Sequence, residues 1–315
     1  MMKINDLMIC SGFVMFFSMA SILIPVVGSF ISLLIPLPFL FYSSKLGLQQ
    51  GMIIGLISLF IVSMTSTLIG YPHIIIQCIE FGLLGLIISE AFRRKYSFGI
   101  TILGGILTTI CTASVILIAM AAYTGNGPID LILDYFQNDL NQAIHLYENS
   151  GMEQEQITEL QQFSQMFVDL FKKIFPSFII VWTGIVVWIN VIISRPLFAR
   201  KGIRYPNFGS LDRWQAPEFL VWGLIVSGFA LFLPVSGIKW AAANALIVMG
   251  VIYFFGGLSI VLFLFNKYHI PSWARVGIYI LLSIQVVFWL VLALAGLFDQ
   301  WIDLRKIHYQ ENETN

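Results

Sequence analysis

The side chain with the clearest potential for chemistry is Glu80, a carboxyl group inside the apolar segment Ile74–Phe92. A charged group within a membrane span costs on the order of 2.5–3.5 kcal/mol at the centre and usually faces the interior of a helix bundle. His73 and Gln77 precede Glu80 at the spacing i, i+4, i+7, which places all three on one face of a helix. We predict that these three residues bind a polar or cationic solute or relay a proton. The alternative is a protonated or paired Glu80 that only locks helices together.

Two further residues are secondary candidates. Tyr71 stands with Pro72 directly before this polar stripe, and Asn190 is a lone amide in the apolar segment Ile174–Leu197. A lone amide in a span more often bonds a neighbouring helix than a ligand, so both interpretations of Asn190 stay open.

Motifs for catalysis or cofactor binding are absent from the sequence. It contains no HExxH, GxSxG, GxGxxG or Walker-type phosphate loop, and its four histidines show no metal-ligand spacing. No basic run is interleaved with aromatic residues, as nucleic-acid binding would require. We therefore expect no enzyme, no cofactor, no metal site and no nucleic-acid partner.

The elements that must position these residues are membrane helices. The 315 residues are 58% hydrophobic and 11% charged, against about 25% charged in soluble domains. The bilayer is therefore the expected partner of most of the chain, which we predict to be an all-α, polytopic transmembrane bundle. Nine apolar segments can be distinguished: Leu7–Val27, Phe30–Tyr42, Met52–Ile69, Ile74–Phe92, Phe98–Tyr123, Ile174–Leu197, Phe219–Val235, Ala241–Phe265 and Val276–Phe298.

Lysine and arginine give the expected orientation, because cytoplasmic loops carry an excess of both. The clusters Arg93–Lys95 and Arg195–Arg213 should both be cytoplasmic, and two spans separate them. Nine spans in a multi-pass cell-membrane protein then place the N-terminus in the cytoplasm and the C-terminus outside. If the 13-residue segment Phe30–Tyr42 does not span, only the N-terminus changes sides. This topology leaves Arg305 and Lys306 on the outer, unfavoured side.

One long polar stretch, Thr124–Lys173, interrupts the apolar pattern and carries eight acidic residues. Its apolar residues recur at helical spacing, Pro128 fits a first helical position, and Asn149–Gly151 is typical of a helix stop. We predict an extracytoplasmic amphipathic helical hairpin, which either covers a site as a lid or simply prolongs spans five and six. The basic stretch that begins at Ala199 divides a membrane domain at 1–200 from a linker, three spans and a polar tail at 201–315.

Prolines and glycines are unusually dense between Ile24 and Gly55. At membrane depth they are tolerated where protein or a water-filled cavity satisfies the freed backbone groups, so this stretch is expected to border a site. Its pattern of Ile24-Pro25, Leu37-Pro38, Gly47, Gly51 and Gly55 resembles the substrate-binding S-components of energy-coupling-factor vitamin transporters. The layout of the whole chain resembles the YybS-type family of multi-pass membrane proteins from Gram-positive bacteria.

The S-component resemblance implies a solute site near the outer ends of the first six helices. We therefore predict a transporter-like component that binds or translocates a small-molecule solute, with energy from a protein partner in the membrane or from an ion gradient. The alternative is a non-transporting membrane scaffold or signalling partner that acts through the outer hairpin and the cytoplasmic loops.

Overall fold

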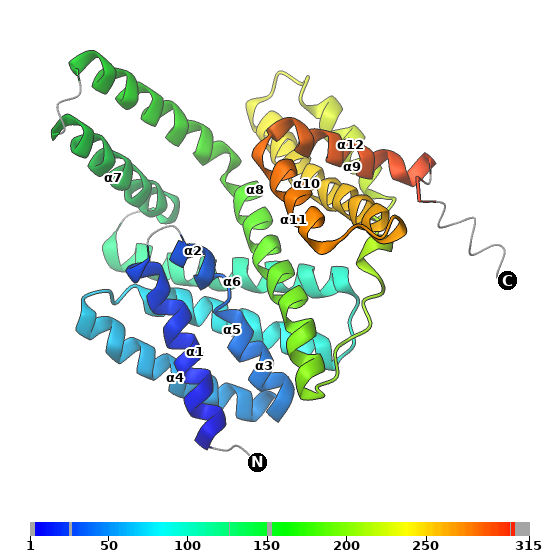
Figure 1. Ribbon diagram of the computed structural model, residues 1–315. Coiled ribbons are helices and arrows are strands. Elements are labelled where there is room, and N and C mark those ends of the chain that lie inside the picture. Colours follow the sequence, from blue (N-terminus) through cyan, green and yellow to red (C-terminus); the bar gives the residue numbers. More distant parts are fainter. Residues whose placement is uncertain (1–3, 25–26, 126, 150–152, 303, 306–315) are drawn as a thin grey trace. The chain divides into compact units, whose positions relative to one another are not determined.

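The computed structural model describes residues 4–24, 27–125, 127–149, 153–302 and 304–305. Within these ranges every regular element is helical, which confirms the all-α membrane class (Figure 1). The chain divides into two compact units. Unit 1 comprises residues 1–169 and 182–207, and unit 2 comprises residues 170–181 and 208–315.

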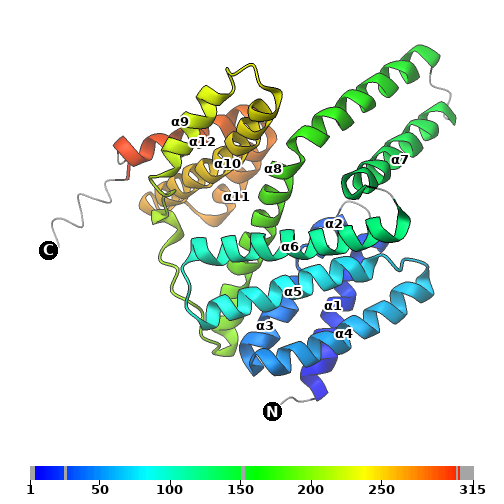
Figure 2. The same cartoon turned by 180° about the vertical axis from the view of Figure 1, so that it is seen from behind.

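Unit 1 is built from the first eight helices, with the last of them shared with unit 2. Their bounds are α1 (Ile4–Leu23), α2 (Val27–Ser32), α3 (Pro36–Leu46), α4 (Leu48–Ile69), α5 (Ile74–Arg93), α6 (Phe98–Thr124), α7 (Pro128–Asn149) and α8 (Gln154–Lys201). Helix α5 is central, because it packs against α3, α4 and α6 (Figure 2).

Unit 2 contains the basic loop and four helices. In order they are the 3-10 turn η1 (Leu211–Arg213), α9 (Leu220–Ala230), α10 (Ser236–Lys267), α11 (Ser272–Ile284) and α12 (Val286–Ile302). Its core gathers Tyr253, Met249, Val221 and Ala216, which join α10 and α9 to the end of the loop.

Seven of the described helical segments are long and apolar enough to cross a membrane, or eight if a bent pair counts as one span. The short segment Phe30–Tyr42 becomes the 20-residue stretch Val27–Leu46, which includes α2 and α3. The segment Phe219–Val235 forms only the 11-residue helix α9. The segment Val276–Phe298 is not one continuous helix, because α11 and α12 meet at a bend of 105°.

Close helix packing depends on glycine at particular crossings. A Cβ atom on Gly85 of α5 would lie 2.4 Å from the Pro36 carbonyl oxygen, at the start of α3. Phe39 packs over Gly82 and Gly55, so its ring fills the space between α3, α4 and α5. Glycine at these positions lets the broken helix approach α5 closely.

The start of α1 and the end of α3 lie together. Lys45 Nζ is 2.6 Å from Asp6 Oδ1, and the Ser44 and Ser89 hydroxyls are hydrogen-bonded at 2.9 Å. The ends of α3 and α5 therefore lie at the same level as the start of α1. This is the arrangement expected if α2 and α3 together return the chain to the side from which α1 begins.

The polar stretch forms α7 and the first part of α8. Helix α7 begins at Pro128, whose missing N–H is harmless at a first helical position. Helix α8 continues without a break from Gln154 to Lys201. The rings of Phe136 and Phe167 lie 5.8 Å apart, so α7 packs against the polar part of α8 (Figure 1).

Candidate functional site

Glu80 lies on α5, at the edge of the face that this helix buries. Its side chain is half-buried and makes no hydrogen bond or ion pair with any residue that the structure describes. Glu90 on the same helix provides the contrast. Arg93 and Arg94 both donate to its carboxylate, at 2.8 and 2.6 Å.

Gln77 lies one turn before Glu80 and connects α5 to the broken helix. Its Nε2 donates to Ser32 Oγ at 3.3 Å, and Ser32 in turn donates to the Ser29 carbonyl at 2.8 Å. Ser32 is the last residue of α2 and is buried. The amide of Gln77 therefore holds the end of α2 against α5.

Asn190 reaches the next residue of the same break from α8. Its Nδ2 donates to the Leu33 carbonyl and to the Val186 carbonyl, both at 2.8 Å. The Asn190 side chain is fully buried, yet its Oδ1 has no hydrogen-bond partner among the residues that the structure describes. The structure thus brings Gln77 and Asn190 to adjacent residues, Ser32 and Leu33, from two different helices.

The break that these amides stabilise follows from the two prolines of α3. Pro36 and Pro38 have no backbone N–H, and the Leu37 N–H bonds the Leu34 carbonyl rather than that of Leu33. The Leu33 carbonyl consequently lacks its helical donor and accepts the Asn190 amide instead. The protein itself satisfies this freed backbone group, as is required at membrane depth. Pro25, the first proline of the stretch, lies outside the described residues.

His73 and Tyr71 are not part of this cluster. Both side chains are exposed before the first residue of α5, with their rings 5.8 Å apart. The two form an aromatic pair at the entry to α5, where His73 is the N-cap residue and has helical backbone angles.

Sequence reasoning missed Ser32, the Leu33 carbonyl and Thr109. The Thr109 hydroxyl on α6 is buried and has no hydrogen-bond partner within the described ranges. A Cβ on Gly105, one turn before it, would lie 3.1 Å from Leu84, which is one turn after Glu80. Helices α5 and α6 are neighbours joined by residues 94–97, so they run antiparallel. Since Gly105 lies opposite Leu84, one turn further along α6 places Thr109 at the level of Glu80. The only signal for Thr109 was its membership of a threonine-rich helix.

The pocket and the metal-ligating side chains that the structure describes do not add to this site. A pocket of about 560 Å³ lies in unit 2 and includes none of the five candidate residues in its lining. No group of three or more His, Cys, Asp or Glu within the described ranges could hold a metal ion.

Comparisons with known proteins agree with the membrane layout. The family model "Predicted membrane protein (DUF2232)" matches residues 12–300. The "Uncharacterized protein YybS" of Bacillus subtilis (strain 168) is 23% identical over 286 residues, which cover 90% of this chain and 91% of that protein. No solved structure matches. The YybS-type resemblance is thereby confirmed, whereas the likeness to S-components stays a prediction. The chain belongs to the DUF2232 family of membrane proteins.

Proposed function

We propose that the protein binds a small polar or cationic solute within the membrane and acts as a transporter-like binding or translocation component. The observation that supports this most is the carboxyl group of Glu80 on α5, which has no partner in the part of the chain that the structure describes. Intramembrane carboxyl groups normally pair within the protein, as the cost of burying them demands. A ligand that brings a cation or a hydrogen-bond donor supplies the missing partner.

The groups near the break favour a ligand that donates hydrogen bonds. Gln77 already donates to Ser32, and Asn190 uses its Nδ2 on two carbonyls. Three groups near the break have no partner among the described residues: the Asn190 Oδ1, the Thr109 hydroxyl and the carboxyl group of Glu80. An amide oxygen and a carboxylate are acceptors only, so an ammonium or guanidinium group suits them.

The proposed role involves binding and movement without a chemical step. No nucleotide-binding motif occurs in the sequence, so energy would come from a protein partner in the membrane or from an ion gradient. The bilayer surrounds the helices in either case.

Ligand-dependent thermal stabilisation tests the proposal. The full chain in detergent is unfolded by heat with choline, spermidine or arginine as cationic probes, and with glucose as a neutral comparison. Three proteins are compared: wild type, Glu80→Gln and Glu90→Gln. The last makes the same chemical change on α5 at a carboxylate that arginines already bind.

We expect at least one cation to raise the unfolding temperature of the wild type and of Glu90→Gln, and no cation to raise that of Glu80→Gln. An equal rise in all three proteins would remove Glu80 from the site. If no cation stabilises the wild type, the proposed ligand class is wrong.

A further inference from the structure

Asp212 in the basic loop is hydrogen-bonded to the end of α10. Asn266 Nδ2 donates to Asp212 Oδ2 at 2.8 Å, and Ser259 donates to the carbonyls of Leu211 and Trp214. Helix α10 has 32 residues and is about 48 Å long, whereas the hydrocarbon core of a bilayer is about 30 Å thick. Its last turns therefore extend to the membrane interface, where they contact the loop that precedes α9.

The start of α11 is held at the same place. Arg275 Nη1 donates to Asn266 Oδ1 at 3.0 Å, while its Nε and Nη2 donate to the carbonyls of Ile270 and Phe265. Asn266 thus connects Arg275 to Asp212. The first turn of α11 lies at the end of α10 and at the level of the loop.

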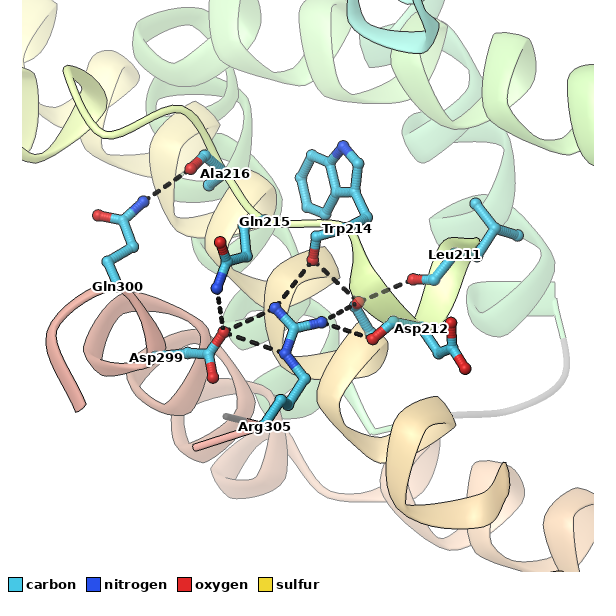
Figure 3. Close-up of polar contacts among 9 residues, drawn as sticks. Leu211, Asp212, Trp214, Gln215, Ala216, Asp299, Gln300 and Arg305 are labelled. Atoms are coloured by element: carbon cyan, nitrogen blue, oxygen red, sulfur yellow. Dashed lines mark hydrogen bonds and ion pairs between the residues drawn. The ribbon is translucent and has the colours of Figure 1, made fainter. Parts of the chain in front are cut away.

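The end of α12 returns to this loop, as Figure 3 shows. Arg305 is buried, and its guanidinium donates to the Asp212 carbonyl at 2.6 Å and to the Trp214 carbonyl at 3.1 Å. It also pairs with Asp299 at 2.6 Å, and Gln300 donates to the Ala216 carbonyl at 2.8 Å. Arg305 also donates to Ser259 Oγ on α10 at 2.7 Å, so Asp299 compensates its charge while its remaining donors bond the loop carbonyls and α10.

Between these two ends the chain reverses. Helices α11 and α12 meet at Gln285 with a bend of 105°. Helix α11 has 13 residues and is about 20 Å long, enough for one leaflet and too short for the whole core. At the bend, Trp289 Nε1 donates to the Leu282 carbonyl at 3.0 Å. A side chain thus satisfies a backbone group that the break has freed.

We infer that α11 and α12 form a re-entrant pair, which enters and leaves the membrane on the face that holds the loop 208–217. A span would place Arg275 and Arg305 at opposite interfaces, whereas Asp212 joins both within one chain of hydrogen bonds. Arg305, which follows α12, then lies on the loop face. The pair also places Arg305 on the same side as the basic loop, contrary to the expectation from nine spans, whereas Lys306 lies outside the described residues.

Thiol accessibility on the full-length protein tests this topology. Cys10, Cys78 and Cys111 are first replaced by serine. Single cysteines are then introduced by Glu218→Cys after the loop, Ser236→Cys at the start of α10 and Thr314→Cys in the tail. Glu218 and Ser236 are exposed and lie at opposite ends of the segment that contains α9. Intact cells and inverted vesicles are labelled with a membrane-impermeant maleimide, and labelling in detergent shows that each thiol reacts.

We expect the cysteines at positions 218 and 314 to be labelled in the same preparation, and the one at 236 only in the other. Labelling of 314 together with 236 would show that α11 and α12 span the membrane and would overturn the inference. Labelling of 218 together with 236 would also overturn it, since α9 and α10 would not then bring the chain back to the loop face.

Discussion

Asn190 and Leu33 lie 157 positions apart in the chain, and a hydrogen bond of 2.8 Å joins the amide of one to the carbonyl of the other. The bond connects α8 to the break between α2 and α3. It occurs where Pro36 and Pro38 leave the backbone without its usual donors. Helix α8, which begins in the polar stretch, thus stabilises the proline-broken helix next to the residue that Gln77 binds.

Replacement of Asn190 should destabilise unit 1. Asn190→Leu keeps the side-chain volume close to that of the amide but leaves the Leu33 carbonyl without a donor. We expect a loss of about 1–2 kcal/mol, since hydrogen bonds between membrane helices average about 0.6 kcal/mol and an unsatisfied buried acceptor costs more. Unfolding of the purified protein in detergent measures it. Asn141→Leu, at an exposed amide of α7, is the matched control and should have little effect. Equal stability of both variants would show that the Leu33 carbonyl does not need Asn190.

The crossing of α10 and α12 should be sensitive to a single methyl group. A Cβ on Gly257 would lie 2.1 Å from the Leu292 carbonyl oxygen, which is backbone and cannot rotate away. Gly257→Ala should therefore separate the helices and cost about 1–3 kcal/mol, as overpacking does. Gly250→Ala on the same helix meets no atom within 4 Å and should cost nothing. Thermal unfolding of the two variants and of the wild type measures the loss of stability. A Gly257→Ala protein as stable as Gly250→Ala would contradict the close crossing.

Hydropathy was enough to predict the membrane class and most helices, because a long apolar run has few alternatives to a helix in lipid. It could not detect the break at Gln285, since the residues on both sides are as apolar as those of a span. The bend is visible only in the structure, where Trp289 donates to the Leu282 carbonyl. There Arg305 bonds Asp212 directly, and Arg275 is connected to Asp212 through Asn266.

Candidate residues could be selected by their polarity in apolar segments, but their partners could not. Gln77 and Asn190 were selected this way, while Ser32 was hidden in a stretch notable for its prolines. The Leu33 carbonyl has no sequence signal, because any residue supplies one. His73 matches the helical spacing and is the N-cap of α5 with helical backbone angles, but its exposed ring pairs with Tyr71, and the spacing alone could not show that contact.

Acid should weaken the loop cluster around Asp212. Partial burial raises the pKa of this carboxyl. Hydrogen bonds from Ser210, Asn266 and its own backbone amide, together with the nearby charge of Arg213, outweigh burial and leave the pKa below its ordinary value. A lowered pKa in the folded state contributes stability that is present above the unfolded pKa of about 3.9 and is lost as pH falls through the folded pKa. We expect Asp212→Asn to be less stable than wild type at pH 6, and the difference to shrink below about pH 4. Thermal unfolding of both proteins across this range measures it. A difference that stays constant with pH would show that the charge of Asp212 contributes no stability.

The indole of Trp289 should contribute to the bend between α11 and α12 through its N–H alone. Trp289→Phe retains an aromatic ring near Phe254, whose ring centre is 6.1 Å away, but removes the donor to the Leu282 carbonyl. In lipid no water replaces that donor, so we expect a loss of about 1 kcal/mol in thermal unfolding. Trp273→Phe on α11 is the matched control, because Trp273 is 80% exposed and donates to none of the described residues. If the two variants lose the same stability, the effect is that of an indole at the membrane interface, and the hydrogen bond to Leu282 does not hold the bend.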